Sequence, residues 1–283
     1  MVRRWRYVVP NLVTCASIGA AMLSIAEAMN AHFESSAWFA LLCVLMDKLD
    51  GTVARLLGAS SRFGIEMDSL SDLIGFGVAP AVLILAFLSG QSAATPLAVL
   101  PLYRAGVYIA CILYVVAAAL RLAKFNILTD AYGPHFFFGI PTTVCGGLLM
   151  SYFLTARKYG APLWAFEILP GAMVACALAM VSRIPLPKMG KRKTLFVNVF
   201  TMANVCLVYI FGLLRLFPEY LLWAAVTYLV VGISWAMMKR VRPPRPVPAA
   251  PPGPAAPPVS PQAEEPAGVV AAGAEPEEPV SGP

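Results

Sequence analysis

The chain has 283 residues, of which 59% are hydrophobic and 13% charged, and its mean hydropathy is +0.73. These values exclude a soluble globular domain, because several apolar runs reach about 20 residues, the length at which a helix spans a bilayer. The net charge of +6 is better explained by loops that face anionic lipid headgroups than by binding of nucleic acid. We therefore predict an all-α, polytopic transmembrane helix bundle.

About eight spans are expected. The first apolar run is long enough to cross the bilayer and lacks a small-residue cleavage site, so we interpret it as a transmembrane helix. The predicted spans are 8–29, 34–57, 68–89, 103–122, 138–156, 162–182, 196–214 and 218–238. We assign residues 1–242 to a membrane domain and residues 243–283, rich in Pro, Ala and Glu, to a disordered cytoplasmic tail. A tether or docking role is the alternative for this tail, but its composition favours a solvated extension.

The basic residues predict the orientation of the bundle. With a cytoplasmic N-terminus and eight spans, all but four of the 21 Lys and Arg residues fall on the cytoplasmic side. The exceptions are Arg104, Arg157, Lys158 and Arg215. This imbalance follows the positive-inside rule. We therefore expect both termini on the cytoplasmic side of the cytoplasmic membrane.

Four aspartates, Asp47, Asp50, Asp68 and Asp72, lie where the second predicted span ends and the third begins. Carboxylates are unfavourable at membrane depth, so such a cluster indicates a functional site. Spacings of three and four residues place each pair on one helix face, and antiparallel neighbouring helices bring the pairs together. The repulsion between the carboxylates then requires cations, and an all-oxygen cluster suits Mg²⁺ or Mn²⁺. This site is expected at the cytoplasmic end of the bundle.

Small residues and an arginine accompany the acids. Gly51, Ala54 and Gly64 leave room for a ligand near the helix backbone, and Arg55 offers a planar fork for phosphate oxygens. The combination predicts a diphosphate held by cations that bridge carboxylate and phosphate oxygens. One aspartate is then left to take a proton from an incoming hydroxyl.

The structural alternative is that the glycines allow close helix packing and that the acids form helix-end salt bridges. Their partners would be Lys48, Arg55 and Arg62. We favour the chemical interpretation, because eight specified positions rarely coincide by chance.

The full pattern is Asp47-x-x-Asp50-Gly51-x-x-Ala54-Arg55, then Gly64-x-x-x-Asp68-x-x-x-Asp72. It resembles, without departure, the signature of the CDP-alcohol phosphotransferases, membrane enzymes that move a phosphoalcohol from a CDP-linked donor to an acceptor hydroxyl and release CMP. The resemblance implies a six-helix core, to which this chain adds two spans, and a homodimer. It also implies two divalent ions held by the four aspartates, with Asp72 also the general base. The residues implied to border the cytidine diphosphate are Gly51, Ala54, Arg55 and Gly64.

Other stretches are similar to the membrane-embedded phosphatidylserine synthases of that family. They are Pro10–Thr14, Ala119–Asn126, Phe138–Thr142 and Met180–Arg183. This resemblance implies transfer of the phosphatidyl group of CDP-diacylglycerol to L-serine among membrane lipids, and it adds Asn11 and Thr14 to the nucleotide site. The implied acceptor-binding residues are Arg121, Lys124 and Asn126. For Arg121 an interfacial anchor is an equally weighted alternative, and for Asn126 a helix C-cap.

Two alternative functions stay open. Another acceptor, such as glycerol 3-phosphate or a phosphoinositol, carries a phosphate and would need a further cluster of basic residues. Arg121 and Lys124 are only two such residues, although the loop Pro187–Lys193 could contribute. A cation-coupled transporter is the alternative from a different class. It is less favoured, because the acids gather at one cytoplasmic end rather than near the bilayer midplane.

Overall fold

In the computed structural model, which describes residues 2–58, 61–90, 100–128, 136–187 and 195–238, the elements are almost all helical. In chain order they are α1 (Val2–Met29), α2 (Phe33–Leu57), α3 (Arg62–Asp72), the π-helical segment η1 (Leu73–Val78), α4 (Ala79–Gly90), α5 (Pro101–Leu128), β1 (Phe136–Phe138), α6 (Thr142–Lys158), α7 (Trp164–Glu167), α8 (Leu169–Val181), β2 (Pro185–Pro187), α9 (Leu195–Leu213) and α10 (Pro218–Met238). The strands β1 and β2 pair antiparallel. The predicted all-α class is confirmed.

Each predicted span coincides over most of its length with a helix or a nearly continuous helical run. Within the described residues, five segments are long and apolar enough to cross a membrane. They are Val8–Met29, Arg62–Gly90, Pro101–Ile127, Trp164–Val181 and Pro218–Met238. The membrane class is therefore confirmed. Eight crossings stay a prediction, because α2 carries the charged motif, α6 has 17 residues and the apolar segment of α9, Asn198–Leu213, is too short to count as a span.

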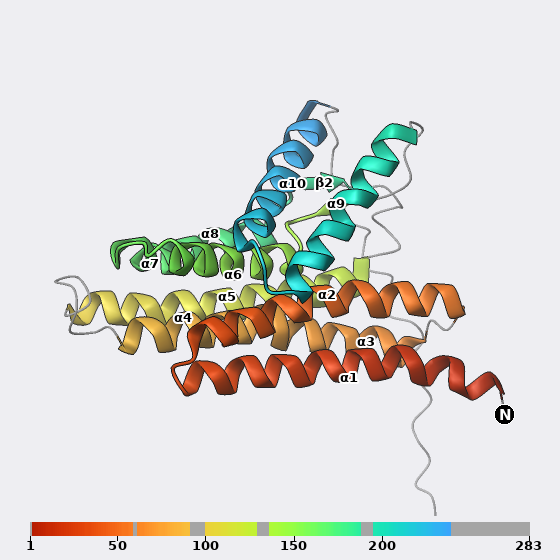
Figure 1. The fold of residues 1–283 in the computed structure, drawn as a ribbon, viewed down its shortest axis with the longest axis horizontal. Helices are drawn as coiled ribbons and strands as arrows, with labels where there is room; N and C mark the ends of the chain where they lie inside the picture. Colours follow the sequence, from red (N-terminus) through yellow and green to blue (C-terminus); the bar gives the residue numbers. More distant parts are fainter. Residues whose placement is uncertain (1, 59–60, 91–99, 129–135, 188–194, 239–283) are drawn as a thin grey trace, which may run out of the picture. The chain divides into compact units, whose positions relative to one another are not determined.

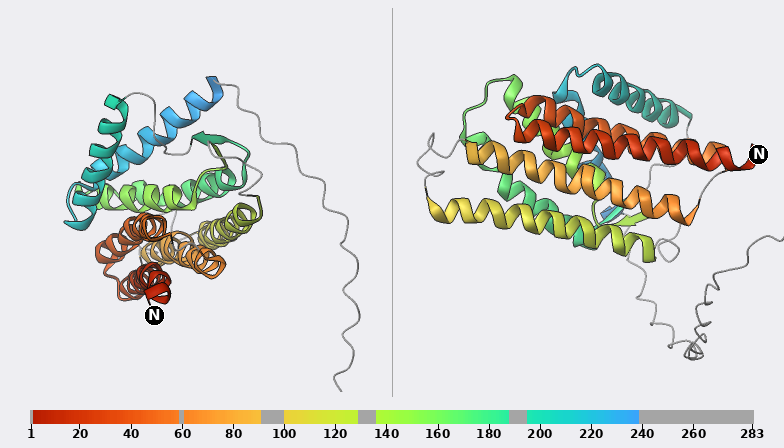
Figure 2. Two further views of the ribbon diagram at one scale, coloured as in Figure 1. Left: turned by 90° about the vertical axis from the view of Figure 1, so that its right-hand side faces the viewer. Right: turned by 90° about the horizontal axis from the view of Figure 1, so that it is seen from below.

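The first helices run back and forth alongside one another (Figures 1 and 2). Helix α1 packs against α2 and α4, α2 packs against α6, and α5 packs against α8 and η1. Because the directions alternate, the end of α2, the start of α3 and the end of α5 lie at the same end of the bundle as the start of α1, on the right in Figure 1. That end carries the aspartate motif.

The opposite end has an aromatic core. Phe87 of α4 stacks edge to face with Phe33 and Phe153, at 5.1 Å between ring centroids in each pair, and lies 4.9 Å from the ring of Phe166. Aromatic clusters of this kind stabilise helix packing beyond the area that they bury. Phe33 precedes Asp47 by about 20 Å along α2, at 1.5 Å per residue. The aspartates are thus well separated from this aromatic cluster.

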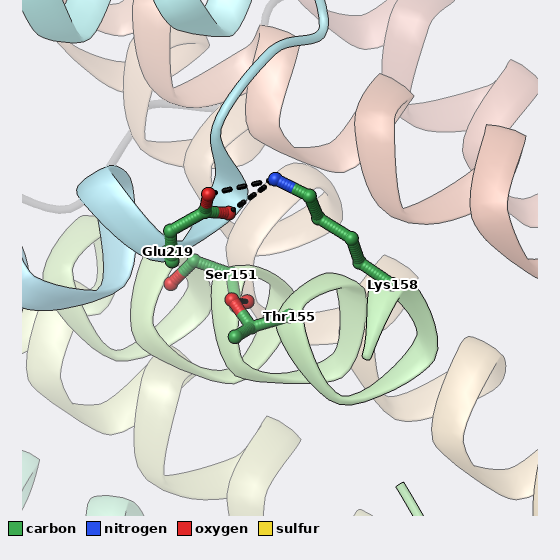
Figure 3. A network of polar contacts seen from close by, with 4 residues as sticks. All are labelled: Ser151, Thr155, Lys158 and Glu219. Atoms are coloured by element: carbon green, nitrogen blue, oxygen red, sulfur yellow. Dashed lines mark hydrogen bonds and ion pairs between the residues drawn. The ribbon is translucent and has the colours of Figure 1, made fainter. Parts of the chain in front are cut away.

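An ion pair joins two helices near the end that carries this aromatic core. Nζ of Lys158, the last residue of α6, lies 2.7 and 2.9 Å from the two carboxylate oxygens of Glu219 in the first turn of α10 (Figure 3). The Lys158 ammonium also lies 5.2 Å from the centroid of the Phe217 ring. The pair is partly exposed, so it positions the start of α10 rather than adding much stability.

Two predicted boundaries were wrong. The third helix begins at Arg62, six residues before the predicted span, because Ser61 caps it: the Gly64 N–H donates to Ser61 Oγ (3.0 Å). The fifth span does not start at 138, because residues 136–138 form β1 and α6 begins at Thr142. Gly139 has φ +87° and Pro141 has φ −59°, ψ 141° at the N-cap, so the chain is not helical before Thr142.

Candidate active site

Asp47 and Asp50 of α2 meet Asp68 of α3 at one end of the bundle. One carboxylate oxygen from each residue lies within 4.8 Å of those from the other two. Asp50 is buried, with 5% of its surface exposed, and the other two are half-buried. In the described part of the chain, Asp68 Oδ1 is a buried atom without a hydrogen-bond partner. Three converging carboxylates with an unmatched buried oxygen fit a hard divalent cation, which prefers oxygen ligands.

Asp72 ends α3, one turn after Asp68. Its carboxylate is half-buried and interacts electrostatically with Asp47, Asp68 and the guanidinium of Arg121. The fourth signature aspartate therefore adjoins the group of three.

Two threonine hydroxyls hold the aspartates of α2. Thr14 Oγ1 of α1 donates to Asp50 Oδ2 at 3.1 Å, and it also lies 3.1 Å from the Pro10 carbonyl. Thr143 Oγ1 of α6 donates to Asp47 Oδ2 at 3.4 Å. Sequence reasoning included Thr14 but missed Thr143. The available signal was the pair of threonines that follows Pro141 at the start of a helix.

Two of the residues expected at the nucleotide, Gly64 and Asn11, lie side by side near the start of α3. A Cβ atom added to Gly64 would lie 3.1 Å from Ser61 Oγ and 3.5 Å from Asn11 Oδ1, so Asn11 of α1 borders Gly64. The Gly51 N–H donates to Asp50 Oδ1 at 2.6 Å. The side chains of the other two nucleotide candidates, Ala54 and Arg55, lie outside the described residues.

Arg121 of α5 faces the aspartates. Its Nη1 donates to Thr142 Oγ1 at 3.4 Å, and its guanidinium carbon lies 5.2 Å from the centroid of the Phe125 ring. The guanidinium also interacts electrostatically with Asp72. An interfacial anchor would extend toward lipid headgroups, whereas this half-buried side chain turns toward the site. Sequence reasoning missed Thr142 as its partner.

The other two acceptor candidates also lie on α5. Asn126 Nδ2 donates to Ser69 Oγ at 3.0 Å and to Glu66 Oε2 at 3.4 Å, both on α3. Because α5 continues to Leu128, the C-cap interpretation of Asn126 was wrong: the side chain ties α5 to α3. Lys124 is half-buried, one turn after Arg121.

The salt-bridge alternative for the acids is tested by the contacts of the described side chains, which include Lys48 and Arg62 but not Arg55. Lys48 interacts electrostatically with Asp47 and Asp68 but forms no ion pair with either. The two ion pairs present among the described side chains, His32 with Glu27 and Lys158 with Glu219, involve none of the four signature aspartates. The aspartates face one another across α2 and α3, an arrangement that is repulsive until a cation binds. This geometry indicates a binding site rather than a structural contact.

Comparison with known proteins places this geometry in a family. Residues 7–184 match the sequence model of the CDP-alcohol phosphatidyltransferase family. The chain belongs to this family. A CDP-diacylglycerol–serine O-phosphatidyltransferase of Helicobacter pylori is 34% identical over 233 residues, which cover 81% of this chain and 94% of the relative. An enzyme of the same name from Mycobacterium leprae is 34% identical over 188 residues (64% of this chain, 59% of the relative), and an archaetidylserine synthase of Methanothermobacter thermautotrophicus is 34% identical over 181 residues (63% and 69%).

The segment that matches the CDP-alcohol phosphatidyltransferase family contains the whole site. It begins before Asn11 and ends after Thr143, whereas α9 and α10 lie beyond it. The resemblance drawn from the aspartate signature is therefore confirmed.

Proposed function

We propose that this protein transfers the phosphatidyl group of CDP-diacylglycerol to the hydroxyl of L-serine, forming phosphatidylserine and CMP. The observation that carries the proposal is the convergence of Asp47, Asp50 and Asp68, with one unmatched buried oxygen, in a chain of this family. Relatives named for transfer to serine support the choice of acceptor.

We propose that Asp47, Asp50, Asp68 and Asp72 hold two divalent ions, Mg²⁺ or Mn²⁺. Such ions, when bound, supply positive charge that offsets the diphosphate and the departing CMP. Thr14 and Thr143 orient the carboxylates of Asp50 and Asp47. Asn11, Thr14, Gly51, Ala54, Arg55 and Gly64 would border the cytidine diphosphate.

Asp72 is the proposed general base. Its carboxylate takes the proton of the serine hydroxyl as the serine oxygen attacks the phosphorus that bears the lipid. A new phosphorus–oxygen bond forms to serine, and the bond from that phosphorus to the oxygen of the CMP phosphate breaks. CMP leaves with the electron pair of that bond.

The decisive experiment gives purified protein CDP-diacylglycerol and a panel of alcohols, with product lipids identified by mass. Phosphatidylserine together with CMP is the expected result. Use of glycerol 3-phosphate or a phosphoinositol instead would show that serine is not the acceptor, but it would leave the proposed metal site intact. Absence of CMP release with every alcohol would overturn the transferase function and favour a transporter.

Arg121 is the proposed acceptor residue, and Lys124, one turn later on α5, is proposed to assist it. A guanidinium can hold the serine carboxylate through two parallel hydrogen bonds, which an ammonium cannot. We expect Arg121→Lys to raise the KM for serine at least about tenfold while the KM for CDP-diacylglycerol changes less than about twofold. Initial rates with each substrate varied in turn measure both constants.

Arg104→Lys is the matched control, because Arg104 lies at the opposite end of the same helix. It should leave both constants unchanged. Equal effects of Arg121→Lys on the two substrates would place Arg121 at the diphosphate or in the scaffold instead.

We further propose that the protein lies in the cytoplasmic membrane with both termini and the aspartate site on the cytoplasmic side. Catalysis would reside in residues 1–242, and the tail 243–283 would take no part in it. The support is the distribution of Lys and Arg and the gathering of the site at one end of the bundle. The homodimer implied by the family stays a prediction that cross-linking in membranes would test.

Labelling of single cysteines tests the orientation. In a variant without native cysteines, a cysteine after Arg245 or between Gly58 and Arg62 should react only when the cytoplasmic face is opened to an impermeant reagent. A cysteine at Ala31, in the turn between α1 and α2, should react in intact cells. Reaction of all three positions from the same side would reject the proposed topology.

A further inference from the structure

Directly after Asp72 the helix changes its hydrogen-bonding pattern. Residues Leu73–Val78 form the π-helical segment η1, and the Ala79 N–H donates to the Ile74 carbonyl, five residues back. A π segment inside an α-helix is rare and often lies at a functional site. A π segment has more residues per turn than an α-helix. It therefore rotates the side-chain directions of α3, which precedes it, relative to those of α4, which follows it. The direction of Asp68 and Asp72 therefore depends on η1.

A proline and a tyrosine determine the hydrogen bonding of the Phe76 carbonyl within this segment. Pro80 follows Phe76 by four residues and has no N–H, so the α-helical bond to the Phe76 carbonyl cannot form. The Tyr114 hydroxyl of α5 donates to that carbonyl instead, at 2.7 Å. Tyr114 is fully buried, so water does not compete for the bond.

Helices of the active site converge on η1. A Cβ atom added to Gly75 would lie 3.1 Å from Cys43 Cβ of α2, and one added to Gly77 would lie 3.3 Å from Ala118 Cβ of α5. Gly146 of α6 packs on the backbone of Phe76, because a Cβ atom there would lie 3.1 Å from Phe76 Cα. These three helices carry Asp47, Arg121 and Thr143, so η1 is the junction between them and the two aspartates of α3.

We propose that Tyr114 is a positioning residue for the cation site. By donating to the Phe76 carbonyl it holds η1 in its π-helical form, and η1 in turn sets the direction of Asp68 and Asp72 toward α2 and α5. Tyr114 precedes Arg121 by about 10 Å along α5, at 1.5 Å per residue, so it acts through η1 and not by contact with substrate. The inference rests on the proposed function, because it concerns the same cations.

Tyr114→Phe in the full-length protein in detergent tests this role, because it keeps the ring and removes the hydroxyl. Mn²⁺ affinity is measured from the electron paramagnetic resonance signal of free Mn²⁺, and kcat and KM from CMP release. We expect Mn²⁺ binding to weaken and kcat to fall, each at least about tenfold, with the KM for CDP-diacylglycerol within about twofold of wild type. Tyr152→Phe is the matched control: the Tyr152 hydroxyl donates to the Ala165 carbonyl at 2.8 Å, away from the aspartates, and its loss should leave Mn²⁺ affinity unchanged.

Pro80→Ala combined with Tyr114→Phe supplies a backbone N–H four residues after Phe76. This N–H can make the α-helical bond to the Phe76 carbonyl, so it satisfies the carbonyl without favouring the π-helical form. We expect this double variant to fold but to bind Mn²⁺ at least about tenfold more weakly than wild type, whether or not the single variant folds. A folded double variant with wild-type Mn²⁺ affinity would overturn the proposal. So would a folded Tyr114→Phe protein with wild-type Mn²⁺ affinity and kcat, or a loss that Tyr152→Phe shares equally. CMP release by the wild-type protein, purified in the same way, tests the proposed function separately. If the wild-type protein releases CMP, these outcomes count only against the role of Tyr114.

Discussion

Replacing any one of the four signature aspartates by asparagine is expected to lower turnover at least about 100-fold while the protein stays folded. The amide has almost the shape of the carboxylate, so packing persists. It lacks the negative charge that Asp47, Asp50 and Asp68 would offer a cation, and in place of Asp72 it cannot accept the serine proton. CMP release by each purified variant at saturating Mn²⁺ measures the effect.

Glu34→Gln is the matched control, because Glu34 is an acid in the first turn of the same α2 that carries Asp47 and Asp50. It should retain wild-type turnover. Near-normal turnover of Asp50→Asn or Asp68→Asn, with the dependence on divalent metal intact, would remove the two-helix metal site from the mechanism.

Gly139→Ala is expected to abolish activity or folding. A Cβ atom at this position would lie 2.3 Å from the Met180 carbonyl oxygen, and φ is +87°. The backbone cannot yield easily, because the Gly139 N–H donates to the Ile184 carbonyl (2.9 Å) and the Ile140 N–H to the Ala179 carbonyl (3.1 Å). We expect a loss of at least about 3 kcal/mol in the free energy of unfolding or a shift of the start of α6.

That shift would move Thr142 and Thr143 away from Arg121 and Asp47, so turnover per folded molecule should fall at least about 100-fold. Thermal unfolding in detergent and CMP release measure the two effects separately. Gly160→Ala is the control for backbone strain alone, since Gly160 has φ +60° but no atom lies within 4 Å of an added Cβ. If both variants lost the same stability and turnover, backbone strain at positive φ would explain the loss, and the close approach of Gly139 to Met180 would not be its cause.

Hydropathy was sufficient to locate the helices, because a bilayer demands an apolar run of about 20 residues and such a run is visible in the sequence. It failed at the start of α6. Residues 136–138 are apolar, yet their backbone pairs with residues 185–187. A window of hydrophobicity does not distinguish an apolar strand from an apolar helix start, and the partner strand is far away in the chain.

The acceptor candidates show a similar limit. Arg121 and Asn126 were singled out together, but the structure turns Arg121 toward the aspartates and Asn126 toward Ser69 and Glu66 of α3. The two residues are five apart on one helix, so they point in different directions, and only the positions of the neighbouring helices say what each meets.

The sequence by itself determined the membrane class and the pairing of aspartates on two helix faces, because both follow from local periodicity and composition. It also determined the family, since all the signature residues lie in one short stretch of the chain, from Asp47 to Asp72. Only the tertiary structure decided which distant residues complete the site. Thr143 reaches Asp47 across 96 residues of chain and Tyr114 reaches Phe76 across 38. Such contacts depend on how helices pack, and helix packing is a property of the whole bundle that no local stretch of sequence encodes.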